Sequence, residues 1–64
     1  MSVFIENLTN RLVLLRLNSG QTLHLAPRAS SREIPDIEVR KNLKVQKLLD
    51  RHIIALHKAK EVKS

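Results

Sequence analysis

The segment 11-RLVLLRLNSGQTLHLAP-27 has the pattern of two strands joined by a turn, and the other elements are interpreted around it. Gly20 is the only glycine of the chain, and it can adopt the positive φ that hairpin turns often require. In 22–26, Leu23 and Leu25 alternate with Thr22 and His24, as in a strand with one buried face. Pro27 lacks a backbone donor and should end this strand.

The first half of the hairpin, residues 11–17, is apolar on both faces. One predicted face carries Leu12, Leu14 and Arg16, and the other carries Val13, Leu15 and Leu17. Strands with two apolar faces are usually covered on both sides. The pattern therefore predicts that this strand is central in a sheet or sandwiched between layers.

Further elements flank the hairpin. A short β-prone run predicts a strand over 3–6, followed by a turn, and alternation predicts another strand over 37–40 after a polar loop. Asn42 is a favourable N-cap residue. The helical spacing of Val45, Leu48 and Leu49 then predicts a helix over 43–51.

The segment after this helix has two interpretations. The β-branched pair Ile53 and Ile54 favours a last strand over 53–57, with His52 in the helix-terminating position. Alternatively, Ile53, Leu56 and Ala59 continue the apolar stripe of a helix toward residue 60. We favour the strand. The expected fold is α+β: one domain over 1–57, with a small twisted antiparallel sheet, one helix and a flexible polar tail over 58–64.

Composition limits the classes of function. The chain has 64 residues, no cysteine, one aromatic residue and a formal charge of +6. Such a small domain often needs a partner for stability, and it has neither disulfides nor thiolate ligands to replace one. The charge suits nucleic acid or an acidic protein surface. We expect no signal peptide and no membrane span, because no long apolar run is present.

The predicted helix carries a row of positive charge, formed by Lys44, Lys47 and Arg51. Their spacing places them on one helix face. Arg40 would join them if the helix began earlier. These four residues are the candidate partner-binding site, and a merely solvated helix face is an equally strong interpretation.

Catalytic, metal and cofactor sites have little support in the sequence. It contains no glycine-rich phosphate loop, no HExxH motif and no cysteine nucleophile. His24 should lie on the exposed face of its strand, and the spacing of His52 and His57 matches no zinc pattern. The acidic residues Glu33, Asp36 and Glu38 fit turn chemistry and surface charge. We therefore expect a protein that is not an enzyme and needs no cofactor.

Two longer stretches, 5-IENLTNRLVLLRLNSGQTLHLAP-27 and 38-EVRKNLKVQKLLDRHIIAL-56, carry a resemblance. They resemble the very small proteins encoded among the sheath, tube and baseplate genes of contractile phage tails and phage-tail-like injection particles. In such proteins a glycine often follows the KLLxR helix, where this chain has His52. The resemblance implies a structural or assembly role in a bacterial cytoplasm or in the particle itself. The implied partners are sheath, tube, baseplate or cap proteins. Apart from the resemblance, association with a second copy of the chain also stays open.

A different class of function remains open. The +6 charge and the helical row also suit a small basic nucleic-acid-binding protein. Against it stand the β-rich first half and the lack of aromatic side chains for stacking bases. A regulatory partner protein of the toxin–antitoxin kind is a third alternative.

Overall fold

The structure is a computed structural model that describes residues 2–59. It contains five strands, one 3-10 turn and one α-helix. In chain order they are β1 (Ser2–Asn7), β2 (Val13–Arg16), β3 (Thr22–Leu25), β4 (Ile34–Pro35), η1 (Asp36–Glu38), α1 (Leu43–Asp50) and β5 (Ile54–Lys58). The predicted α+β class is confirmed.

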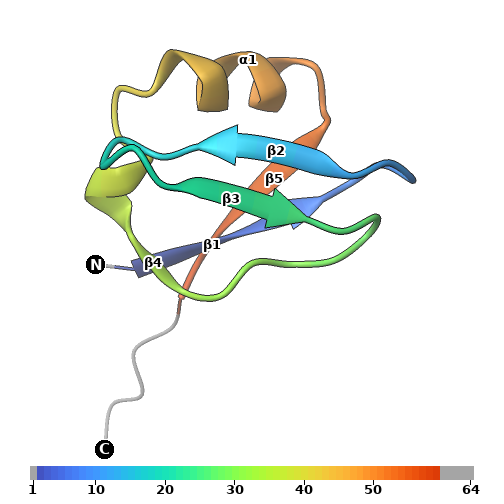
Figure 1. The fold of residues 1–64 in the computed structure, drawn as a ribbon, viewed down its shortest axis with the longest axis horizontal. Helices are drawn as coiled ribbons and strands as arrows, with labels where there is room; N and C mark the ends of the chain where they lie inside the picture. Colours follow the sequence, from blue (N-terminus) through green and yellow to red (C-terminus); the bar gives the residue numbers. More distant parts are fainter. Residues whose placement is uncertain (1, 60–64) are drawn as a thin grey trace, which may run out of the picture.

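The strands form two antiparallel sheets. In the three-stranded sheet β1 lies between β4 and β5, and its ladder with β5 runs from Val3 opposite Lys58 to Asn7 opposite Ile54. In the second sheet β2 pairs with β3 alone. Figure 1 shows this hairpin crossing in front of β1 and β5, with α1 along the side of β2. The core lies between the two sheets and beneath the helix.

The aliphatic core follows the alternation of the strands. Inward-facing positions of β1, β3 and the β2 segment are buried, and their outward neighbours are exposed or half-buried. Val45 is the one helical residue that is fully buried. The core consists of Val3, Ile5, Leu15, Leu17, Leu23, Leu25, Ile34, Val39, Val45 and Ile54.

The β2–β3 turn confirms the predicted role of Gly20. The backbone N–H of Leu17 donates to Gln21 O at 2.8 Å, and that of Gly20 donates to Leu17 O at 2.9 Å. Gly20 closes this three-residue loop with φ of 97°. Glycine adopts such a conformation without the steric cost that a Cβ would add.

The prediction that residues 11–17 form a central or sandwiched strand is wrong. The two faces were assigned correctly, since Leu15 and Leu17 are buried. However, no layer covers the other face within residues 2–59, where Leu12 and Leu14 are 59% and 53% exposed. The sequence pattern reports two apolar faces, but it does not reveal whether the second is covered within the same chain.

The predicted strand over 37–40 is also wrong. Residues Asp36–Glu38 form a 3-10 turn, and Asp36 O accepts hydrogen bonds from the N–H groups of Val39 and Arg40. Pro35 fixes the extended entry to this turn, with φ of −61°. Local hydrogen bonding therefore outweighs the short alternation of apolar and polar residues.

The predicted N-cap, helix and last strand are confirmed. The Asn42 side chain accepts from the N–H groups of Lys44 and Val45, and α1 ends at Asp50. His52 then adopts φ of 59° and turns the chain into β5, so the alternative of a helix reaching residue 60 is wrong. Lys58 belongs to β5 rather than to the polar tail, and residues 60–64 of that tail lie outside the described residues.

One buried polar residue ties the two sheets together. Asn7 is 0% exposed at the end of β1. Its Nδ2 donates to the carbonyls of Arg11, Leu25 and Ala26 at 2.6, 3.1 and 3.0 Å. Its Oδ1 accepts from the N–H and the hydroxyl of Thr9. Because buried amides need partners, this position holds the start of β2 and the end of β3 against β1.

Candidate functional site

The basic row, defined as Lys44 and Lys47 of α1 and the C-cap residue Arg51, is exposed. Val45 points into the core from another face of the helix. Within residues 2–59 the carboxylate contacts of basic side chains are Arg40–Asp36 and His57–Glu6, so the basic row has no carboxylate partner there. Its charge is available to an external anion.

Arg40 lies apart from this helix. It follows η1, two residues before the N-cap Asn42, and its Nη2 contacts Asp36 Oδ2 at 2.8 Å. That carboxylate partly satisfies the guanidinium, although such an exposed pair contributes little stability. The helix begins too late to bring Arg40 into the basic row.

A groove of about 620 Å³ lies between β2 and α1. We call it the β2–α1 groove. This volume is within the range of ordinary ligand sites. The lining side chains are mainly apolar, and the two charged ones are both cationic. The lining residues are Thr9, Asn10, Arg11, Leu12, Val13, Leu14, Lys44, Leu48 and Ile53.

The helix end builds one wall of this groove. The N–H of His52 donates to Leu49 O at 3.0 Å, and that of Ile53 donates to Leu48 O at 2.9 Å. These are the two hydrogen bonds of a Schellman cap, in which the first residue beyond the cap is left-handed. Such a cap commonly brings its flanking apolar residues together. Here the two flanking residues, Leu48 and Ile53, both line the groove.

The edge of β2 forms the opposite wall. The bond from Leu17 N to Gln21 O makes Leu15 and Val13 the next positions bonded to β3. By the alternation of antiparallel ladders, the N–H and C=O of Leu14 point away from β3. Outside that ladder, Leu14 has no backbone hydrogen bond to any residue from 2 to 59. This part of the edge is open.

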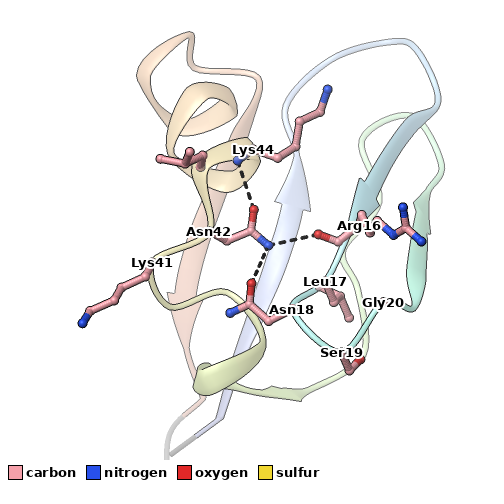
Figure 2. A pocket seen from close by; sticks show the side chains of 9 residues that line it. Arg16, Leu17, Asn18, Ser19, Gly20, Lys41, Asn42 and Lys44 are labelled. Atoms are coloured by element: carbon pink, nitrogen blue, oxygen red, sulfur yellow. Dashed lines mark hydrogen bonds between the residues drawn. The ribbon is translucent and has the colours of Figure 1, made fainter.

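A second hollow, beside the β2–β3 turn, is occupied by structural hydrogen bonds. Asn42 Nδ2 donates to Arg16 O and to Asn18 Oδ1, both at 3.0 Å. Asn18 Nδ2 in turn donates to the carbonyls of Ile37 and Arg40. Figure 2 shows the cationic side chains around this network pointing in different directions, with Lys41 and Arg16 on opposite sides. They do not converge on one anion.

The remaining predicted candidates are dispersed. His24 is exposed on the outer face of β3, as expected. His57 contacts Glu6 Oε1 at 3.0 Å and stacks on Phe4 with ring centroids 5.1 Å apart. Within residues 2–59 no three His, Asp or Glu side chains form a possible metal cluster. Asp36 and Glu38 bind backbone groups and Arg40 around η1.

The sequence pattern indicated the basic row but not the groove beside it. The signal was present in Leu12 and Leu14, which share one face of the predicted strand. What the sequence did not show is that this face adjoins α1 and stays uncovered in the described chain. Lys44 belongs to both features, since it is part of the basic row and also lines the groove.

Comparison with known proteins identifies no relative: no family, characterised protein or solved structure matches the chain. Among the described residues, no helix has the length and apolar character needed to cross a bilayer.

Proposed function

We propose that this chain is a non-enzymatic docking protein that binds a larger protein through the β2–α1 groove and the basic row. The observation that carries the proposal is the position of Lys44, which joins an open apolar groove to positive charge that has no carboxylate partner within residues 2–59. Apolar patches with a polar rim are typical of protein-interaction sites.

The size of the chain supports the same proposal. A 64-residue domain without disulfides buries a modest core, and it leaves Leu12 and Leu14 more than half exposed. A partner that binds only the folded state would add stability by mass action. Docking would therefore cover the exposed face and strengthen the fold together.

The resemblance of 5–27 and 38–56 to small proteins of contractile tails suggests the particular partners. We propose a minor component or assembly factor that contacts sheath, tube, baseplate or cap proteins of a phage-tail-like particle. It would act in a bacterial cytoplasm during assembly or remain in the finished particle.

The test is capture of partners by the tagged protein from the cells that produce it, with and without nuclease. One variant replaces the basic row by glutamine. A matched control replaces three exposed cations outside the groove: Arg28, Arg32 and Lys58. Each change lowers the formal charge from +6 to +3.

We expect tail-like particle proteins in the wild-type and control captures despite nuclease, and a loss in the basic-row variant. If neither capture contains such proteins, the proposed assembly role is wrong. Captured proteins that are lost on nuclease treatment would instead favour the nucleic-acid alternative, in which the affinity for nucleic acid falls steeply with salt. Equal losses in both variants would mean that overall charge, not the basic row, attracts the partner.

A further inference from the structure

We infer that the β2–α1 groove binds an extended, acidic-apolar protein segment as an added β-strand on the open edge of β2. This inference rests on the proposed docking function and names the way in which the partner binds. The segment would hydrogen-bond with Leu14, place apolar side chains between β2 and α1, and direct carboxylates toward the cationic rim.

The backbone argument concerns where β2 is already occupied. At Arg16 the carbonyl accepts from Asn42 Nδ2, so the fold itself fills that end of the edge. At Leu14 the outward N–H and C=O have no such partner within residues 2–59. An incoming strand can supply both bonds, as in other complexes formed by strand addition. Because Asn42 already binds the carbonyl of Arg16, an added strand can pair with β2 only at residues before Arg16.

The apolar argument concerns what borders the open edge. Leu12 and Leu14 are more than half exposed, while Leu48 and Ile53 face them across the groove. Side chains of an added strand alternate between two faces, so those of one face would enter this groove. Burial of these two leucines would remove exposed apolar surface from water.

The charge argument selects the chemistry of the segment. Arg11 and Lys44 line the groove, and none of its lining residues from 2 to 59 is acidic. Lys47 and Arg51 extend the positive charge along the same helix, and neither has an ion-pair partner among residues 2–59. Complementary charge favours encounter and suppresses cationic partners. A segment that alternates apolar and acidic residues fits both the apolar lining of the groove and its cationic rim.

The first test measures binding of a labelled short peptide that alternates valine and glutamate. One comparison peptide carries lysine in place of glutamate, and two others carry N-methyl groups on the amides of one edge or of the other. N-methylation leaves the side chains in place and removes the donors needed for pairing. We expect it to weaken binding by about tenfold for each essential bond, the loss typical of one buried hydrogen bond.

The second test alters the protein backbone. Leu14→Pro removes an N–H that points away from β3, so the β2–β3 ladder keeps its bonds. The matched control is His24→Pro. His24 lies opposite Leu14, and its N–H points away from β2, at the opposite edge of the hairpin. Leu14→Ala, which retains the N–H, separates the loss of the side chain from the loss of the donor.

We expect Leu14→Pro to bind the valine–glutamate peptide at least about tenfold more weakly than Leu14→Ala, and His24→Pro to bind as the wild type does. Equal binding of the parent peptide and of both N-methylated peptides overturns strand addition, even if Leu14→Pro fails to fold. Absence of any binding, or stronger binding of the valine–lysine peptide, overturns it too.

The two proposals fail separately. If the wild-type protein captures tail-like particle proteins and Leu14→Pro captures them equally well, the docking function stands and strand addition is wrong. If no particle protein is captured but the acidic peptide binds in an edge-dependent way, strand addition stands and the particle assignment is wrong. Preference for a short single-stranded DNA over the acidic peptide contradicts the protein-binding groove.

Discussion

Asn42 donates from its side-chain amide to the carbonyl of Arg16 across 3.0 Å, and so takes a position on β2 that a neighbouring strand would otherwise occupy. The same side chain accepts from the N–H groups of Lys44 and Val45 at the start of α1. One residue therefore caps the helix and fixes its distance from the hairpin. The width of the β2–α1 groove depends on this link.

Two substitutions of Asn42 separate these roles. Asn42→Ala removes both, and we expect it to lower the free energy of unfolding by about 1–2 kcal/mol. Asn42→Asp keeps an acceptor at the helix N-terminus but lacks the Nδ2 donor for Arg16. Its stability, measured by urea denaturation, should fall between those of Asn42→Ala and the wild type. Wild-type stability for Asn42→Asp would contradict this order.

The buried amide of Asn7 should be among the most sensitive polar positions. Asn7→Ala leaves the carbonyls of Leu25 and Ala26 without this donor and opens a cavity between the sheets. We expect a loss of about 3 kcal/mol in the free energy of unfolding. Asn10→Ala is the control, because Asn10 is exposed and should cost less than about 0.5 kcal/mol. Similar denaturation midpoints for the two variants would contradict the role assigned to Asn7.

The left-handed conformation of His52 predicts a stabilising substitution. A non-glycine residue with φ of 59° has a steric cost that glycine avoids. We expect His52→Gly to raise the free energy of unfolding by about 0.5–1 kcal/mol, after the entropic cost of glycine is subtracted. Thermal unfolding measures the change. His24→Gly should have the opposite sign, since His24 lies in an extended strand.

The exposed leucines of β2 should matter for binding and not for folding. Leu14→Gln changes a side chain that is 53% exposed, so we expect a stability change within about 0.5 kcal/mol. Binding of the acidic-apolar peptide, followed by fluorescence anisotropy, should weaken clearly. Ile37→Gln provides the control, because Ile37 is 66% exposed and lies outside the groove. Equal weakening by both changes would indicate nonspecific apolar contact.

Most of the fold follows from local signals in the sequence. The Gly20 turn, the alternation around His24 and the Asn42 cap each specify the conformation of a few residues, and all three occur in the structure. The strand predicted over 37–40 was wrong because alternation over so few residues competes with a 3-10 turn that Pro35 and Asp36 favour. Short strands and short turns differ by one or two hydrogen bonds, which composition does not reveal.

The candidate site was only partly predictable. Helical spacing was sufficient to place the basic row on one face of α1. The groove depends on the distance between α1 and β2, which is set by contacts such as that from Asn42 to Arg16, far apart in sequence. The buried network of Asn7 depends on long-range contacts in the same way. Asparagine in a sequence looks like a turn residue, and its burial appears only after the sheets are packed.

The ladder between β1 and β5 also determines how the fold would respond to mechanical load. Ala59 N–H donates to Ser2 O at 3.0 Å, so the first and last described residues meet at the same end of antiparallel strands. Tension applied through these ends would peel the strands apart one hydrogen-bonded pair at a time. Load applied across the β2–α1 groove would not pass through the β1–β5 ladder. If the chain serves in a contracting particle, as we propose, surface docking would transmit force with less danger of unravelling than a tether through both ends.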